Sequence, residues 1–374
     1  MQDTDPTPAV VPATTDTDVA DWLRLAAAPG VGRITAVHLL RHVGPPAAIF
    51  RASRDQLLEH VTPAQASALC APVSSDTARL VDLTQAWLSQ PGNQLITYLD
   101  ATYPPLLAEI DDAPLLLYIR GRSALLRGAA LAIVGSRNAS VQGQANARAF
   151  AQALAEAGIT VVSGLALGID TAAHDGALRG CGSTVAVIGT GADRIYPARN
   201  AALARRIAEA GCMVSEYPLG TPPRPEHFPQ RNRIISGLAA GVLVIEAAAG
   251  SGSLITARLA NEQGRDVFAL PGSIHAALSK GCHQLIRDGA LLVDSVDDIL
   301  QALALAPLVQ TARATAPVVT SPLLAILGDD AMHIDTILAL GGMTASALSA
   351  ELLALEMAGV VARLPGGMLQ RIHH

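Results

Sequence analysis

The central part of the chain alternates short apolar runs with longer segments of helical character, and this alternation constrains the fold more than any other feature. Almost every run ends in Gly or Ser and leads into a helical segment, which predicts a parallel sheet with crossover helices. Ligands of such sheets bind at the carboxyl ends of the strands, where the loops gather. The predicted strands are Leu131–Val134, Thr160–Val162, Thr184–Ile188, Met213–Ser215, Val242–Ile245 and Val267–Leu270, and the predicted helices include Gln142–Ala157, Thr171–Arg179, Ala201–Ala210 and Ser253–Gln263.

The loops after these strands contain residues that suit an anion site. Gly135 lets a ligand approach the backbone, Ser136 carries a hydroxyl donor, and Arg137 supplies a forked guanidinium. Gly- and Ser-rich loops at helix starts also offer main-chain N–H groups to phosphates. The candidate phosphate-binding residues in these loops are Gly135, Ser136, Arg137, Ser163, Gly164, Ser251, Gly252 and Ser253.

The stretch from Phe228 to Leu238 adds two more arginines. We expect a helix to begin at Pro229, so that Arg231 and Arg233 flank Asn232 at its start. Two guanidiniums there oppose the helix dipole, and a bound anion would remove the conflict. Together with the arginine of the first loop they favour a groove for a polyanion. The alternative is that both arginines are ordinary solvated surface.

The acidic residues near these loops have structural interpretations. Glu216 and Glu246 each follow a predicted strand, and we interpret them as partners that orient the arginines. Asp170 is expected to cap the helix that carries His174, although these two residues and Ser163 could suggest a catalytic triad by residue type. The GxxxxGK[ST], strict GxGxxG and GxSxG motifs do not occur in the sequence. No catalytic residue and no cofactor is predicted.

Composition limits how such a groove can work. Lys280 is the only lysine, so a phosphate site must use guanidiniums or backbone N–H groups. A net charge of −6 argues against a protein coated in positive charge, and 3% aromatic residues limit base stacking. The four cysteines have no CxxC spacing, which predicts reduced thiols, a cytoplasmic location and no metal site. No signal peptide or membrane span is expected.

Two modules are predicted to flank the sheet domain. A Pro-Gly-Val-Gly turn ending at Gly32 lies between two short helices and resembles a helix-hairpin-helix element, a SAM-like arrangement that serves either DNA or protein contact. Near the C-terminus, three helices and a hairpin indicate a winged-helix-like domain. Its third helix carries Glu351 and Glu356 but no Arg or Lys, which favours protein contact or weak DNA contact. The expected divisions are a disordered tail (1–17), a helical N-terminal domain (18–92), a Rossmann-like DNA-binding domain (93–303), a linker (304–321) and the winged-helix-like domain (322–374).

Several blocks together resemble the bacterial DNA-processing protein family DprA, also called Smf. They are Ala132–Arg137, Ser163–Asp170, Phe228–Leu238, Glu246–Arg258 and Gly264–Gly272. The resemblance implies a cytoplasmic homodimer that binds single-stranded DNA without reading its sequence. It further implies protection of incoming strands in natural transformation and loading of the RecA recombinase, and it does not imply an enzyme.

The resemblance also implies which residues contact DNA, and one further segment of the sequence suggests where protomers pair. Gln230 occupies a position that is often basic in the family, and Arg199 lies where relatives often carry a nearby lysine. The segment from Ser279 to Leu292 suggests either packing or self-association. The implied phosphate-binding positions are Gly135, Ser136, Arg137, Arg231, Asn232 and Arg233, with Gln230 and Arg199 added, and the candidate dimer residues are His283, Ile286 and Leu292.

Two other functions fit parts of the pattern. Rossmann-like nucleotide phosphoribohydrolases of the lysine-decarboxylase-like family also place Gly-Ser-Arg after a first strand. Their Pro-Gly-Gly-x-Gly-Thr-x-x-Glu motif is missing from the corresponding region. Glu246 and the Gly250–Ser253 loop resemble it only loosely. A partner-binding scaffold with an empty groove is the third possibility.

Overall fold

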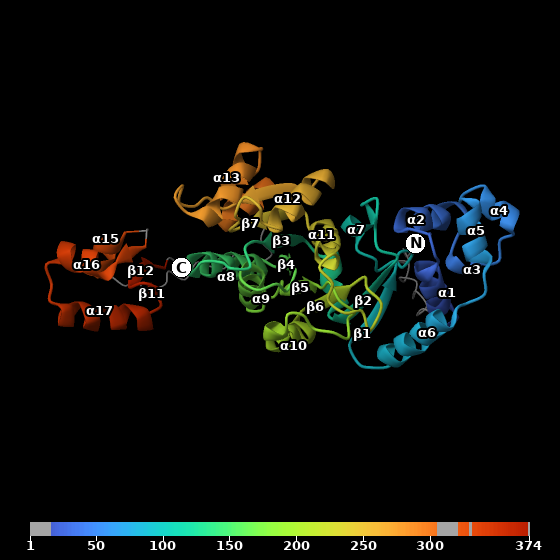
Figure 1. Cartoon of the computed structure of the whole chain (residues 1–374), viewed down its shortest axis with the longest axis horizontal. Helices are drawn as coiled ribbons and strands as arrows, with labels where there is room; N and C mark the ends of the chain where they lie inside the picture. The colour runs from blue at the N-terminus through green and yellow to red at the C-terminus, as the bar shows by residue number, and fades with distance from the viewer. Residues whose placement is uncertain (1–15, 305–320, 329–330, 373–374) are drawn as a thin grey trace, which may run out of the picture.

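The computed structural model describes residues 16–304, 321–328 and 331–372 of the 374-residue chain (Figure 1). The predicted tail (1–17) and linker (304–321) lie outside these residues, apart from their ends. The described chain forms an N-terminal group of helices, a central sheet with helices on both faces, and a small C-terminal module.

Three of the N-terminal helices are capped by the side chain of the residue that precedes them, which is Ser53, Thr62 or Ser74. Ser53 and Thr62 both form capping boxes, which satisfy backbone N–H groups at the helix starts. Their shared core contains Trp22, Leu39 and Trp87 and extends onto Tyr118 of the sheet. The helices are α1 (Asp16–Ala27), α2 (Arg33–His42), α3 (Pro46–Ile49), α4 (Arg54–Leu58), α5 (Pro63–Cys70) and α6 (Ser75–Leu88).

The central sheet has nine strands among the described residues, in the order β1-β2-β6-β5-β4-β3-β7-β8-β9. All six predicted strands are confirmed, and β3 to β9 pair in parallel. The sheet is mixed, because β1 and β2 run antiparallel at one edge, and neither was predicted. The strands are β1 (Asn93–Thr97), β2 (Leu116–Gly121), β3 (Ala130–Val134), β4 (Thr160–Ser163), β5 (Thr184–Val187), β6 (Cys212–Ser215), β7 (Gly241–Val244), β8 (Asp266–Ala269) and β9 (Leu291–Leu292).

Helices cover both faces of this sheet, as Figure 1 shows. The core on one face joins Ile133 and Val161 to α8 and α9, and α10 packs beside them. The core on the other face joins Val134 and Val187 to α11 and α12. The helices are α7 (Pro105–Ala108), α8 (Val141–Glu156), α9 (Ile169–Ala177), α10 (Ala201–Ala210), α11 (His227–Gly237), α12 (Ser253–Glu262), α13 (Lys280–Arg287) and α14 (Val296–Ala302), with 3-10 turns at Ser123–Arg127, Ala198–Asn200 and Ala277–Ser279.

The C-terminal module has the predicted winged-helix arrangement. Leu323, Ile337, Leu352 and Leu369 meet in its core. One short strand, β10, was not predicted and pairs with β12. The elements are α15 (Pro322–Leu327), β10 (Met332–His333), α16 (Ile334–Gly341), α17 (Ala345–Met357), β11 (Val361–Leu364) and β12 (Met368–Arg371).

None of the described helices is by itself both long and apolar enough to cross a membrane. Helices α16 and α17 meet the length and composition criteria only as a pair, and they are bent by 115° to one another.

Candidate nucleic-acid interface

A cleft of about 630 Å³ opens at the carboxyl ends of the central parallel strands. Loops after β3, β4 and β7 line it together with α11, so the Gly/Ser loops of separate strands converge as predicted. The lining residues with polar or aromatic chemistry are Ser136, Arg137, Asn138, Asp170, Phe228, Arg231, Asn232, Ser251, Ser253 and Thr256.

Three helices direct their N-terminal ends at this cleft. The first turns of α9, α11 and α12 contribute Asp170, Phe228 and Ser253 to its lining. A helix N-terminus carries a partial positive charge and unpaired backbone N–H groups. The convergence of three such ends makes the cleft attractive to an anion before any side-chain charge is added.

The loop after β3 is held tightly against its neighbours. The backbone N–H of Ser136 donates to the Glu246 carbonyl oxygen (2.7 Å), and the Ser136 hydroxyl accepts from the Asn138 N–H (3.2 Å). A Cβ at Gly135 would lie 2.6 Å from a side-chain carbon of Ile169, so the loop requires glycine there. The Ser136 N–H is therefore committed to the fold, and the loop serves mainly to present Arg137.

Arg137 is exposed at the mouth of the cleft. Among the described residues, no carboxylate pairs with its guanidinium. Its guanidinium carbon lies 6.0 Å from the centre of the Phe228 ring, and the Tyr196 ring lies 5.5 Å from that of Phe228. A guanidinium and two aromatic rings side by side can hold a phosphate and stack on bases.

Arg231 lines the cleft but does not project into it, which corrects the prediction. Its side chain is buried, and it donates to the carbonyl oxygens of Gly164 (2.7 Å) and Val187. Burial lowers the pKa of Arg231 to about 10, so the guanidinium stays protonated at neutral pH. Its Nε has no hydrogen-bond partner among the described residues. Arg231 is therefore a buried part of the cleft wall, and the nearby Asp170 carboxylate offsets its charge.

Asp170 and His174 are also buried. The Asp170 carboxylate accepts the N–H groups of Gly164 (3.1 Å) and Ala166 (3.2 Å), and the α9 N-cap is Gly168, so the predicted capping role of Asp170 is wrong in detail. Burial raises the pKa of Asp170, while Arg231 and these two donors oppose that shift.

His174 is built in as a neutral side chain. Its Nε2 accepts from the Leu165 N–H (3.2 Å), so Nδ1 carries the proton and donates to Thr184 Oγ1 (2.7 Å). Burial, and then Arg231, lower the pKa of His174 to about 3. Ser163 Oγ donates to the Ile133 carbonyl oxygen (2.7 Å), so the three residues do not form a triad.

Arg233 faces away from the cleft, and its predicted place beside an anion is wrong. Helix α11 begins at His227 rather than at Pro229, which puts the arginines in its second turn. Arg233 pairs with Glu216 (2.7 Å) and Asp112 (2.6 Å), and only 6% of its side chain is exposed. Glu216 is thus an arginine partner, as predicted.

Glu246 is not an arginine partner. Its carboxylate accepts the backbone N–H (2.9 Å) and the hydroxyl (2.5 Å) of Ser140, and so fixes the start of α8. The prediction failed because Glu246 binds Ser140, the N-cap residue of α8, whereas the prediction considered only arginines as its partners.

The remaining predicted residues divide between the cleft and its surroundings. Asn232, Ser251, Gly252 and Ser253 line the cleft with Gly135, Ser136 and Arg137. Ser163 and Gly164 are buried below it. Arg199 and Gln230 are exposed but do not line it. Sequence reasoning missed Asn138 and Thr256, although each follows directly on a recognised loop.

The predicted dimer residues lie at the β9 edge of the sheet. His283 and Ile286 are on α13, and Leu292 in β9 is 47% exposed. One His283 ring nitrogen is 2.9 Å from the Gly272 carbonyl oxygen. The structure describes a single chain, so pairing through this edge stays a prediction.

Comparisons with known proteins agree with this architecture. The family model described as DNA recombination-mediator protein A matches residues 94–304, and that of the DprA winged helix domain matches residues 306–367. Protein Smf of Escherichia coli (strain K12) is 43% identical over 301 residues, which is 78% of this chain and 80% of that protein. DNA processing protein DprA of Streptococcus pneumoniae (strain ATCC BAA-255 / R6) is 52% identical over 202 residues, 54% of this chain and 71% of that protein.

Two solved structures are also similar. The X-ray structure of DNA processing protein A from Streptococcus pneumoniae has a TM-score of 0.64 at 37% identity and covers 77% of this chain and 98% of that chain. A Helicobacter pylori DNA processing protein A, whose structure concerns a single-stranded DNA binding mode, has a TM-score of 0.52 at 30% identity and covers 56% of this chain and 96% of that chain.

Proposed function

The chain belongs to the DNA recombination-mediator protein A (DprA/Smf) family of DNA-processing proteins, and from that premise we propose that its cleft binds the backbone of single-stranded DNA. The exposed guanidinium of Arg137 carries this proposal: it lies in the lining of a cleft that three helix N-termini face, and no carboxylate among the described residues pairs with it. That arrangement recognises phosphate charge, which is the same for every sequence. Binding is accordingly independent of base sequence and weakens as salt concentration rises.

The aromatic pair at the cleft mouth fits a single strand better than a duplex. Phe228 and Tyr196 are 5.5 Å apart, and 48% of Tyr196 is exposed. Unstacked bases of a single strand can pack on such rings, whereas paired bases within a duplex cannot. Two aromatic rings near one arginine therefore support a single-stranded ligand.

We further propose the cellular role and partners that the family relation suggests. The protein protects incoming strands in the cytoplasm during natural transformation, loads RecA onto them and works as a homodimer. It acts by binding, without a catalytic step. In support, the buried His174 is a poor proton carrier, with a pKa of about 3, and no loop supplies the phosphoribohydrolase motif.

Replacing Arg137 tests the cleft directly. We expect Arg137→Ala to weaken binding of a fluorescent oligothymidylate about tenfold, or ~1.4 kcal/mol, because one charge-assisted phosphate contact is lost. Fluorescence anisotropy at fixed ionic strength measures the affinity. Arg79→Ala is the matched control, since Arg79 is 74% exposed on α6, outside the cleft. If Arg137→Ala and the unmodified protein bind the oligomer with equal affinity, the cleft is not the DNA-binding site.

A further inference from the structure

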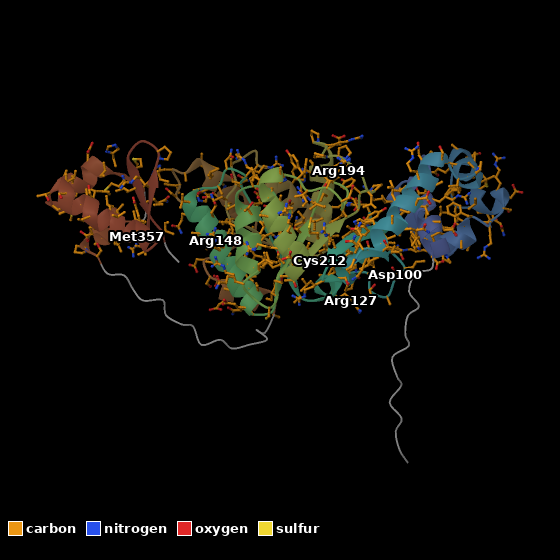
Figure 2. The ribbon with its side chains drawn as sticks, turned by 90° about the horizontal axis from the view of Figure 1, so that it is seen from below. Asp100, Arg127, Arg148, Arg194, Cys212 and Met357 are labelled. Carbon is orange, nitrogen blue, oxygen red and sulfur yellow. The ribbon has the colours of Figure 1, made fainter. Side chains whose placement is uncertain are left out.

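Three arginines gather around one aspartate on the face of the sheet domain that carries α8, α9 and α10. Asp175 of α9 pairs with Arg148 of α8 (3.2 Å) and Arg206 of α10 (2.8 Å). Arg179, which follows the end of α9, approaches the same carboxylate (3.7 Å). Arg148 is labelled in Figure 2, which views the molecule from below. We call these four residues the arginine cluster; none of them lines the cleft.

Close packing of two helices produces the cluster. A Cβ at Gly176 would lie 2.2 Å from the Arg148 carbonyl oxygen, so only glycine allows α8 and α9 to approach this closely. The crossing point therefore sets Arg148 against Asp175, the residue before Gly176. Because Asp175 binds guanidiniums from α8, from α10 and from the segment after α9, it holds them together against their mutual repulsion.

The cluster keeps an excess of positive charge. Among the described residues, Asp175 is the one carboxylate paired with these three arginines, which leaves a net charge of about +2. The exposed fractions of the Arg148, Arg179 and Arg206 side chains are 39%, 53% and 52%. Each guanidinium has five N–H donors, and the contacts to Asp175 use a minority of them. Donors therefore remain available to an oxyanion from solvent.

The neighbouring charges do not cancel this excess. On α10 the exposed side chains of Arg205 and Glu209 carry opposite charges, which offset each other. Glu156, two turns beyond Arg148 on α8, accepts a hydrogen bond from Gln152 (2.8 Å), and Gln152 in turn accepts one from Arg179 (3.3 Å). The positive character is thus local to the cluster.

All three helices start at the rim of the cleft. The N-cap of α8 is Ser140, two residues after Asn138 in the cleft lining. Asn200, at the start of α10, donates to the carbonyl oxygens of Leu165 (2.8 Å) and Ala166 (3.3 Å) in the loop before α9. Within the cluster, Arg148, Asp175 and Arg206 lie six to eight residues after the N-caps of these helices, about 9 to 12 Å from the rim.

We propose that the arginine cluster is a second backbone-phosphate site, which holds the same strand after it leaves the cleft. The inference rests on the proposed single-strand function. Guanidinium forks match phosphate oxygens, and Asp175 prepositions them. At about 3.4 Å per nucleotide along one strand, a strand spans 9 to 12 Å in about three nucleotides. The two sites together fix a path over α8 to α10.

Oligothymidylates of two lengths separate the two sites. We expect Arg148→Ala/Arg206→Ala to lower the affinity for an oligomer of about 30 nucleotides about tenfold, and to leave the affinity for one of about 2 nucleotides, which is too short to reach both sites, unchanged. The slope of log affinity against log salt should become shallower by about 0.7 to 1.4, one to two phosphate contacts of a single strand. Arg79→Ala is again the matched control.

The Asp175→Asn variant should change the affinity for the longer oligomer in the opposite direction. It removes the negative charge and leaves the arginines, so we expect affinity for the longer oligomer to rise about twofold or more. A purely structural role for the ion pairs predicts no such gain. Circular dichroism and thermal unfolding of each variant check that α8 to α10 stay folded.

Specific outcomes overturn the inference. Unchanged affinity of Arg148→Ala/Arg206→Ala for the longer oligomer would do so, as would an equal loss for both lengths. If polyglutamate bound the unmodified protein and lost affinity in the double variant while the longer oligomer did not, the cluster would be an acidic-protein site. If the longer oligomer does not bind the unmodified protein, both the second site and the proposed function are contradicted. If Arg137→Ala weakens binding and Arg148→Ala/Arg206→Ala does not, only the second site is contradicted.

Discussion

At the scale of single residues, burial decides which polar groups can act and which only support the site. His174 has no exposed surface, and its two ring nitrogens are both hydrogen-bonded. Its pKa falls from 6.5 to about 3 on folding, mainly through burial. His174 therefore binds a proton more weakly in the folded state than in the unfolded chain. The stabilising effect is fully present above pH 6.5 and is lost as pH falls towards about 3.

This linkage makes stability depend on pH through one buried imidazole. Between those two pKa values, His174 should remove up to ~1.4 kcal/mol of unfolding free energy for each unit of decrease in pH. Urea unfolding of the unmodified chain and of His174→Gln, compared at about pH 5 and about pH 7, measures the difference. The exposed His275→Gln is the control. A pH dependence that His174→Gln does not reduce would contradict this account.

At the scale of elements, a buried ion network joins the N-terminal helices to the helix beneath the cleft. Glu216 follows β6 and binds Arg33 at the start of α2 (3.0 Å) as well as Arg233 of α11 (2.7 Å). Asp112 completes the network through Arg233 (2.6 Å). The side chain of Glu216 is only 5% exposed, so its charge depends on these two arginines for compensation.

Removing the central carboxylate should loosen both helices. We expect Glu216→Gln to lower the unfolding free energy by about 3 kcal/mol, since Arg233 stays buried with one carboxylate instead of two. Hydrogen exchange should rise in α2 and α11 together, and urea unfolding measures the loss of stability. Glu109→Gln breaks the Arg265 pair, whose carboxylate is 60% exposed, and should cost much less. Exchange that rises in neither helix would show that the network does not couple them.

The same elements show what could and could not be predicted from sequence. The parallel strands were predictable because each apolar run is bounded by its own Gly or Ser signals, and the loop that presents Arg137 follows one of them directly. The burial of Arg233 was not, because its partner Asp112 lies 121 positions away. Likewise, Arg231 donates to Gly164, 67 positions distant. Local reasoning identified Glu216 as an arginine partner, but not the distant carboxylate of Asp112 or the carbonyl of Gly164 that the fold brings to these arginines.

At the scale of the whole molecule, the free edge of the sheet bears on how protomers assemble. Strand β9 ends the sheet order, and Leu291 and Leu292 are 48% and 47% exposed there. An edge strand with unpaired backbone groups and exposed leucines is a ready site for pairing with another chain. His283 and Ile286 lie on α13, the helix that precedes β9 in the chain, and are half-buried. We expect this edge to form the dimer contact.

A charge placed on this edge should separate the protomers. Light scattering should give a dimer mass for the unmodified chain and a monomer mass for Leu292→Arg, because an unpaired guanidinium in an apolar contact costs several kcal/mol. The monomer should keep its affinity for a short oligothymidylate and bind a long one more weakly, since two linked clefts raise the effective concentration of the second contact. Leu340→Arg is the control, because Leu340 is 64% exposed on α16 in the C-terminal module. A dimer mass for Leu292→Arg would place the contact elsewhere, whereas a monomer mass for both variants would mean that any added charge disrupts assembly.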